Sequence, residues 1–374
     1  MRAAVIGYGS IGPTHRAALA ADDRIEQVVV WDHQPRRLAR VEDPAARLPD
    51  AEAIWNDPDI ALVTLATPHP GHADLCRRAL AAGKHVWCEK PLGVLPDQVA
   101  GMQADARLAA DQGLVWSGVF QHRFSPLAGA VRELLGAGTF GPLRETSMEF
   151  ACQRNAAYFA RDPWRGSWEG EGGSLLINQA IHTLDLWLWM LDRVPESVSG
   201  RVENRWTAAF NHCEDLVEGS VLFADGLRGR LHAVNEPDRD RWHSRCRFVG
   251  ERGTVVYDSN HGGRLVEIDH DDPGVIASLR HCQEEVEALR ARPALPGKAC
   301  YGDLHAVQCA DVVSAIIDRR PPRVDFASAA VANQVALAFY HATMSEAPAP
   351  VPVSGYRQPT LSHLISTIPD KETA

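Results

Sequence analysis

The sequence Gly7-Tyr8-Gly9-Ser10-Ile11-Gly12 lies between the apolar run Ala3-Ala4-Val5-Ile6 and a helical pattern at residues 15–21. In a G-x-G-x-x-G motif between a strand and a helix, the first glycine permits a tight turn and the second lets a pyrophosphate approach the backbone. The third lets the helix pack on the strand. Because the start of the helix then faces the phosphates, the motif predicts that residues 7–12 bind a dinucleotide.

An acidic residue after the next predicted strand, residues 27–31, indicates which dinucleotide is bound. Asp32 follows Gly12 by about 20 residues, the distance at which an acid hydrogen-bonds the adenosine ribose and repels a 2′-phosphate. We therefore expect NAD, with His33 also near the cofactor. Arg36 and Arg37 leave NADP open as the alternative, because an arginine here reaches a 2′-phosphate if the loop folds back.

Apolar runs alternate with helical patterns through the first third of the chain. Strands are predicted at residues 60–66, 85–88 and 114–120, with helices at 72–82 and 96–112 between them. This alternation is typical of a parallel sheet, and ligands bind where its strands end. We therefore predict an α/β fold with a Rossmann domain at residues 1–124. Lys90 is placed at one of these strand ends.

From residue 125 the pattern changes, which predicts a second domain over residues 125–374. A helix at 126–135 is followed by segments with strand character at 144–150, 198–206, 216–223, 229–234 and 254–257. Their alternation between Gly-rich turns indicates an α+β domain with a largely antiparallel, open sheet. A helix over residues 172–191 is inserted between the first two strands, so it can lie in the cleft between the domains.

Three polar side chains interrupt this otherwise apolar helix. Asn178, His182 and Asp185 stand at i, i+4 and i+7, which places them on one face. A core helix satisfies such groups internally, whereas an active-site helix presents them to a ligand. The spacing by itself fits both.

Charge and composition exclude several classes of protein. The formal net charge is −10 and Lys and Arg form no long run, which argues against a nucleic-acid partner. No stretch approaches the roughly 20 apolar residues of a membrane helix, and a strand stands where a signal peptide would, so we expect a cytoplasmic protein. The eight cysteines and 16 histidines lack ligand spacing, so neither a disulfide framework nor a metal site is expected.

The order of these motifs resembles the glucose-fructose oxidoreductase, inositol dehydrogenase and rhizopine-catabolism (Gfo/Idh/MocA) family over nearly the whole chain. The most specific part is Ala82-Gly83-Lys84-His85-Val86-Trp87-Cys88-Glu89-Lys90-Pro91-Leu92. The glycine motif, Ala66-Thr67-Pro68, Arg123-Phe124-Ser125-Pro126 and residues 172–185 also match. The resemblance implies an enzyme that oxidises a ring hydroxyl of a sugar or cyclitol to a ketone with a nicotinamide cofactor, or catalyses the reverse reduction.

The resemblance also implies individual roles. Lys90 matches the lysine that contacts the reacting hydroxyl, His182 the histidine that accepts its proton, and Asp185 the downstream acid. Inositol dehydrogenase-like members have an acid where this chain has Asn178, which is the main departure from the pattern. We expect Asp185 and Asn178 to orient the His182 imidazole. The cofactor contacts that the resemblance implies beyond the glycine motif are Ala66, Thr67, Pro68, His72, Glu89, Lys90, Pro91, Gln121, Trp164 and Arg165.

The candidate substrate contacts, beside Lys90, Asn178 and His182, are Arg123, Tyr158 and His305. A neutral sugar or cyclitol is the expected substrate. The acids Asp162, Glu169 and Glu171 would instead suit a cationic aminosugar or an aminoglycoside-like compound.

Two other activities remain alternatives to net oxidation. One is NAD-assisted glycoside cleavage or dehydration, and the other is a sugar sensor that binds dinucleotide without turning over substrate. The family resemblance further implies a homodimer or homotetramer formed through the open face of the antiparallel sheet.

Overall fold

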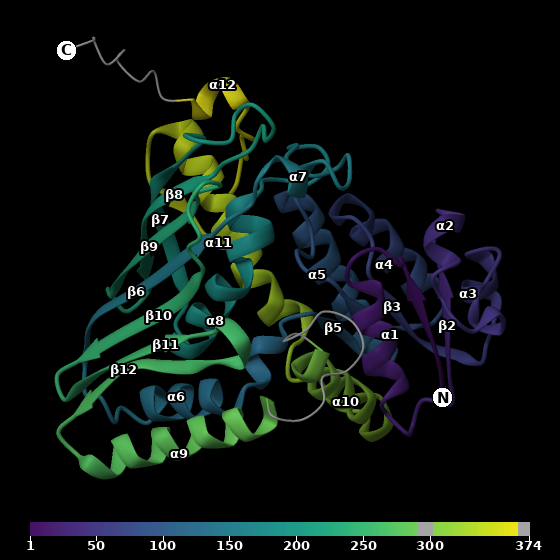
Figure 1. Ribbon diagram of the computed structural model, residues 1–374, viewed down its shortest axis with the longest axis horizontal. Helices are drawn as coiled ribbons and strands as arrows, with labels where there is room; N and C mark the ends of the chain where they lie inside the picture. The colour runs from purple at the N-terminus through teal and green to yellow at the C-terminus, as the bar shows by residue number, and fades with distance from the viewer. Residues whose placement is uncertain (291–301, 366–374) are drawn as a thin grey trace.

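The chain forms two β-sheets, one in each half (Figure 1). The computed structural model describes residues 1–290 and 302–365. The first sheet has five parallel strands in the order β2-β1-β3-β4-β5, which confirms the predicted Rossmann-like fold. Its strands are β1 (Arg2–Ile6), β2 (Gln27–Trp31), β3 (Ile60–Leu65), β4 (His85–Cys88) and β5 (Trp116–Gly118).

Both faces of this sheet are buried. Ala4 and Ile6 of β1 belong to one apolar core, whereas Ala3 and Val5 belong to another, because successive side chains of a strand point to opposite faces. This explains why its strands are continuous apolar runs rather than alternating ones. The helices of this half are α1 (Gly12–Ala20), α2 (Pro35–Leu38), α3 (Glu52–Asn56), α4 (His72–Ala81) and α5 (Pro96–Asp111).

The strand order reverses at β1, which has β2 on one side and β3 on the other. In open α/β sheets, ligands bind beyond the carboxyl ends of the strands at such a switch point. The glycine turn follows β1, Ala66 follows β3 and Glu89 follows β4. The parallel sheet therefore brings segments that are far apart in sequence to one edge.

The second sheet has eight strands in the order β12-β11-β10-β6-β9-β8-β7-β13. All neighbouring pairs are antiparallel except β6 and β9, which confirms the largely antiparallel second domain. Its strands are β6 (Leu143–Cys152), β7 (Pro195–Glu203), β8 (Leu216–Phe223), β9 (Arg228–Asn235), β10 (His243–Gly250), β11 (Gly253–Asp258), β12 (Arg264–His270) and β13 (Ala349–Pro350).

Four helices pack against this sheet and against one another: α6 (Pro126–Gly136), α8 (Ile181–Leu191), α9 (Pro273–Arg290) and α11 (Phe326–Ser345). The helix predicted over residues 172–191 differs from a single α-helix. It begins as a π-helical turn, Leu175–Ala180, and continues as α8. Asn178 lies in the π-helical turn, whereas His182 and Asp185 lie in α8.

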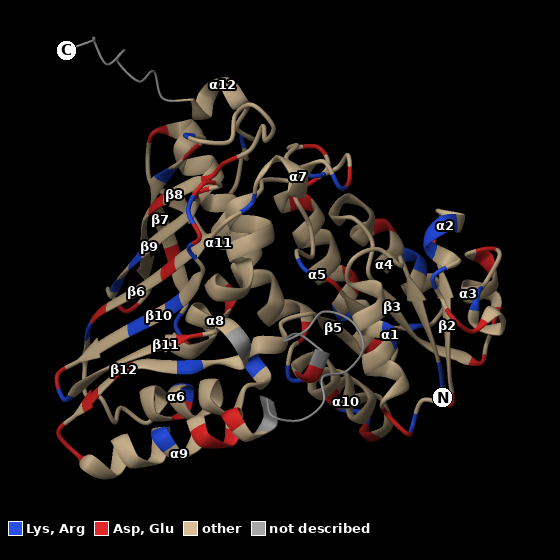
Figure 2. Ribbon diagram, in the orientation of Figure 1, with Lys and Arg blue, Asp and Glu red and all other residues tan. Residues whose placement is uncertain are grey.

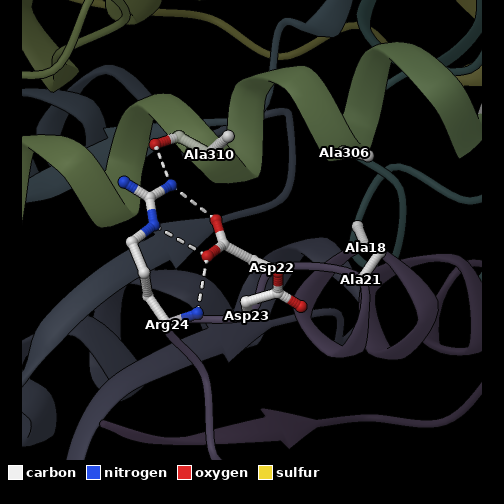
Figure 3. A pocket seen from close by; sticks show the side chains of 7 residues that line it. All are labelled: Ala18, Ala21, Asp22, Asp23, Arg24, Ala306 and Ala310. Atoms are coloured by element: carbon white, nitrogen blue, oxygen red, sulfur yellow. Dashed lines mark hydrogen bonds and ion pairs between the residues drawn. The ribbon is translucent and has the colours of Figure 1, made fainter.

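A helix from late in the chain completes the first half. Helix α10 (Gly302–Asp318) packs on α1, and its residues Cys309 and Val312 join the core that contains Ala18. Arg24 donates a hydrogen bond to the Ala310 carbonyl at 3.1 Å (Figure 3). It also donates to Ser314 Oγ at 2.7 Å. The boundary at residues 124–125 stays a prediction, and α10 belongs structurally with the N-terminal sheet.

Acidic and basic residues are interspersed over both halves (Figure 2). Within residues 1–290 and 302–365, no helix is long and apolar enough to cross a bilayer. The remaining described helices are short: α7 (Ala156–Phe159) and α12 (Leu361–Leu364).

Candidate active site

The glycine turn after β1 leaves no room for a side chain at Gly7 or Gly12. Gly7 has φ +94°, and a Cβ atom there would lie 2.5 Å from the Ala66 carbonyl oxygen. A Cβ atom on Gly12 would lie 2.5 Å from the Gly7 oxygen, so α1 begins directly against the turn. At Gly9 the nearest atom to such a Cβ is the Arg37 guanidinium, at 3.6 Å. Bare backbone at a helix N-terminus suits a pyrophosphate.

Asp32 holds this turn to β2. Its Oδ2 atom accepts a hydrogen bond from the Tyr8 amide and its Oδ1 atom one from the Gln34 amide, each at 2.7 Å. Arg37 lies 3.8 Å from Asp32 and 2.6 Å from Asp162 of the second half. The two carboxylates therefore engage the arginine. His33, also predicted near the cofactor, has an exposed side chain.

Two buried polar groups at the strand ends lack partners in the described part of the chain. Neither amide atom of Gln121 is hydrogen-bonded, and neither is the Thr67 hydroxyl. Buried polar groups nearly always have hydrogen-bond partners. The Gln121 amide and the Thr67 hydroxyl are therefore suited to hydrogen-bond a bound cofactor. His72 differs, because its ring nitrogens lie 2.8 Å from the Pro91 oxygen and 3.1 Å from the Thr67 oxygen. It joins two strand-end loops.

Glu89 interacts with α1 rather than with solvent. Its Oε1 atom lies 2.7 Å from His15 Nε2. Burial would raise the pKa of Glu89, but the hydrogen bond to His15 and the charge of Lys90 bring it below its ordinary value. His305 of α10 lies against His15, with ring centroids 5.4 Å apart. His305, predicted as a substrate contact, is therefore buried beside the glycine-turn helix.

His15, Glu89 and His305 form the one cluster of potential metal ligands in residues 1–290 and 302–365, and their ligand atoms lie within 4.8 Å of one another. The closest approach is the 2.7 Å contact between His15 and Glu89, which is a hydrogen bond. We assign the group to positioning Glu89.

Lys90 directly follows Glu89 and forms a cis peptide with Pro91. Its Nζ atom donates to the backbone oxygen of Asn178 at 2.8 Å and to Asn178 Oδ1 at 2.9 Å. The Asn178 side-chain nitrogen in turn donates to Glu171. A continuous hydrogen-bonded chain thus runs from Lys90 through Asn178 to Glu171.

Glu171 is fully buried and accepts a second hydrogen bond from the Gly166 amide at 2.5 Å. Burial raises the pKa of Glu171 to about 7, although the Gly166 and Asn178 hydrogen bonds and the charges of Arg165 and Lys90 oppose the shift. Sequence reasoning treated Glu171 as part of an acidic loop. The only signal for its true position is that it directly precedes the two glycines.

His182 lies in the first turn of α8 and is half-buried. Its ring packs edge-on against Phe120 and His122, at centroid distances of 5.9 and 5.5 Å. Its Nδ1 atom has no hydrogen-bond partner among the described residues. Burial, followed by the charge of Lys90, lowers the pKa of His182 well below its ordinary value, so the imidazole is neutral at pH 7.

Asp185 does not orient His182, which corrects the sequence-based expectation. Its carboxylate accepts two hydrogen bonds from Arg123, from Nε at 2.8 Å and from Nη2 at 2.5 Å. Both side chains are buried, and Arg123 also donates to the Ser328 carbonyl at 3.1 Å. A buried carboxylate needs a partner cation, and Arg123 fulfils that need. Arg123, a candidate substrate contact in the sequence, is thus engaged in a buried ion pair with Asp185.

Tyr158 and two neighbours missed by sequence reasoning, Arg154 and Gln179, form a polar network beside Asn178. Gln179 Nε2 donates to the Tyr158 hydroxyl at 2.6 Å, and Arg165 donates to the same oxygen. Arg154 Nε donates to Gln179 Oε1 at 2.9 Å. The sequence could have indicated Gln179 as a site residue, because it directly follows Asn178. Trp164, predicted in the nicotinamide pocket, has its ring 4.9 Å from that of His69.

The structure removes the basis for a cationic substrate. Asp162 pairs with Arg37 and, at 3.5 Å, with Arg165. Glu171 is buried, and Glu169 alone of the three acids is exposed. These acids do not form a free anionic surface.

The five-stranded parallel sheet and its glycine turn are those of a dinucleotide-binding Rossmann domain, and the chain belongs to the Gfo/Idh/MocA family. Residues 1–118 match the oxidoreductase family with an NAD-binding Rossmann fold, and residues 129–256 match the GFO/IDH/MocA C-terminal domain. The resemblance seen in the sequence motifs is confirmed.

Curated relatives are named dehydrogenases. The 1-carboxy-3-chloro-3,4-dihydroxycyclo hexa-1,5-diene dehydrogenase of Comamonas testosteroni is 31% identical over 236 residues, 62% of this chain and 57% of that protein. The trans-1,2-dihydrobenzene-1,2-diol dehydrogenase of Macaca fascicularis is 33% identical over 238 residues, 62% of this chain and 66% of that protein. The chain thus matches less than two thirds of the length of these relatives.

Solved structures share the fold over nearly the whole chain. The WlbA dehydrogenase of Bordetella pertussis, in complex with NADH and UDP-GlcNAcA, has a TM-score of 0.82 at 22% identity and covers 95% of this chain and 98% of its own. A levoglucosan dehydrogenase in complex with NADH has a TM-score of 0.76 at 20% identity, covering 95% and 100%.

Proposed function

We propose that this protein is an NAD-dependent dehydrogenase that oxidises a secondary ring hydroxyl of a sugar or cyclitol to a ketone, or catalyses the reverse reduction. One observation carries the proposal: Asn178 holds the Lys90 ammonium through two oxygens, and the neutral His182 imidazole lies within the field of that charge. The relatives support it, because their names refer to diol and levoglucosan dehydrogenases, and WlbA was crystallised with UDP-GlcNAcA.

The residues that would hold the cofactor are Gly7, Gly9 and Gly12 at the pyrophosphate, Asp32 at the adenosine ribose, and Gln121 at the nicotinamide end. The engagement of Arg37 with Asp162 and Asp32 supports NAD over NADP, because a neutralised arginine is less available to a 2′-phosphate. When bound, the nicotinamide supplies a hydride acceptor for the carbon that carries the hydroxyl.

His182 and Lys90 divide the proton chemistry. His182 accepts the hydroxyl proton, for which a neutral imidazole is required. Lys90 donates a hydrogen bond to the same oxygen and stabilises its developing negative charge. Both residues act on the same substrate oxygen, so hydride transfer at the full rate requires both.

Glu171 acts as a positioning residue for Lys90. Glu171 accepts a hydrogen bond from the Asn178 amide, whose oxygen accepts one from Lys90. It thereby supplies, from one residue further away, the negative charge that an acid at position 178 would provide. Because its pKa is about 7, this charge is present mainly above neutral pH. Asn178 and Glu171 together take the place of that acid.

The test is a spectrophotometric screen for NADH formation with NAD and NADP against neutral sugars, cyclitols, sugar acids and aminoglycosides. Net NADH from one substrate class, lost in Lys90→Met and His182→Ala, is the expected result. Product formed without net NADH identifies glycoside cleavage or dehydration instead. Tight NADH binding with no conversion of any class identifies a sensor.

A further inference from the structure

Three arginines surround the ring of Tyr158 on α7, which lies between the two halves (Figure 1). The guanidinium carbons of Arg154, Arg165 and Arg161 lie 4.4, 4.5 and 5.8 Å from the ring centroid. The chain as a whole carries a net charge of −10, so this cluster is a local reversal of sign. Such a reversal attracts anions.

Arg154 is held in place without a carboxylate. Its guanidinium stacks on the rings of both Tyr158 and Trp242, the latter at 4.8 Å, and its Nε atom donates to Gln179. Among residues 1–290 and 302–365, no Asp or Glu forms an ion pair with Arg154 or Arg161, whereas Arg165 pairs with Asp162. Stacking fixes the guanidinium plane and leaves the two terminal nitrogens of Arg154 as a preorganised fork.

This fork adjoins the reactive residues. Gln179, which binds Arg154, directly follows Asn178, which binds Lys90. Arg165 and Lys90 both lower the pKa of Glu171, so the cluster and the lysine act on one buried carboxyl. Lys90 and Arg154 therefore bind two consecutive residues of the same turn.

We propose that Arg154, assisted by Arg161, binds an anionic group of the substrate, a carboxylate or a phosphate, while Lys90 and His182 act on a hydroxyl of the same molecule. This assignment rests on the proposed dehydrogenase function and narrows its substrate class to acidic sugars or cyclitols. A guanidinium edge accepts two oxygens of either anion in parallel hydrogen bonds, which a neutral sugar does not offer.

The test is calorimetric binding to the NADH-loaded protein of three probes: D-glucose, D-glucuronate and D-glucose 6-phosphate. We expect at least one anionic probe to bind about tenfold or more tightly than glucose, as one charge-assisted contact provides. The stronger of the two probes distinguishes a carboxylate from a phosphate. Arg154→Met, which keeps the stacked aliphatic stem, abolishes the preference, and Arg161→Ala weakens it.

The matched control is Arg239→Met, which removes an exposed arginine that pairs with Glu236 in the loop ahead of Trp242. It leaves the preference for the anion intact. Equal or undetectable binding of all three probes overturns the proposal, as does an anion preference that survives in Arg154→Met with unchanged thermal unfolding. Failure of the dehydrogenase function is separate, because it appears as absent NADH formation while the anion preference persists.

Discussion

Lys90 Nζ lies 2.8 Å from the backbone oxygen of Asn178 and 2.9 Å from its side-chain oxygen. A single residue thus holds the ammonium with two acceptors. One of them belongs to the backbone of the π-helical turn and survives any substitution of the side chain. The lysine and the asparagine side chain are therefore separable by mutation.

Lys90→Met removes the charge that stabilises the alkoxide, so we expect kcat to fall by more than about a hundredfold. Asn178→Ala keeps the backbone acceptor, and we expect a fall of only about tenfold, the worth of one charged hydrogen bond. Steady-state kinetics on the best substrate measures both. NADH binding, followed by fluorescence, should stay nearly unchanged; equal losses in the two variants would contradict the separation.

Glu171 predicts a pH dependence. Because burial raises its pKa to about 7, the carboxyl is neutral below that pH and ionised above it, where it reinforces the charge of Lys90 through Asn178. We expect kcat/KM to rise by about tenfold through pH 7, the effect of about 1.4 kcal/mol. In Glu171→Gln this inflection disappears. An inflection unchanged in the variant would assign it to another group.

His182 predicts where activity fails in acid. Its pKa is lowered from its ordinary value of 6.5 by burial and by Lys90, so protonation, and with it loss of the base, begins only below that pH. In the Glu171→Gln background, where the inflection near pH 7 is absent, kcat/KM should stay level down to pH 6.5. His182→Ala should lose more than about a hundredfold at every pH tested. A midpoint at or above 6.5 in that background would rule out a buried, neutral base.

The Arg123–Asp185 pair predicts a loss of stability rather than a loss of chemistry. Arg123→Met leaves a buried carboxylate without its cation, so we expect the free energy of unfolding to fall by about 3–5 kcal/mol. The double variant Arg123→Met/Asp185→Leu should recover much of this loss, because no buried charge remains. Urea denaturation measures both. If Asp185→Leu lowered kcat as strongly as His182→Ala without affecting stability, Asp185 would have a catalytic role after all.

The first half of the fold is predictable because its signals are local. Gly7 and Gly12 are required because the turn itself leaves no space there for larger residues. Strands β2 and β3 are buried on both faces, so each is a continuous apolar run that can be recognised in the sequence. β10 escapes prediction for the opposite reason. Its inward residues Cys246 and Phe248 alternate with Arg245 and Arg247 on the other face, and the arginines obscure the strand.

The candidate site is predictable in its identities but not in its pairings. Lys90 and His182 come from a strand end and a helix, both readable from the sequence. The partners of Asn178 and Asp185 depend on which cation the fold brings near each of them, and i, i+4 spacing does not encode this. Sequence reasoning therefore proposed one polar face where the structure has two separate networks.

The packing of α10 on α1 has a consequence for synthesis on the ribosome. When the first 124 residues have emerged, the side chains that cover Ala18 and Leu19, among them Cys309 and Val313, have not yet been made. The nucleotide-binding half therefore keeps an apolar stripe in water until residue 318 is translated. Domains that fold as units usually mature in order from the N-terminus. Here the core of the first half is completed only after β6 to β12 of the second sheet have been synthesised.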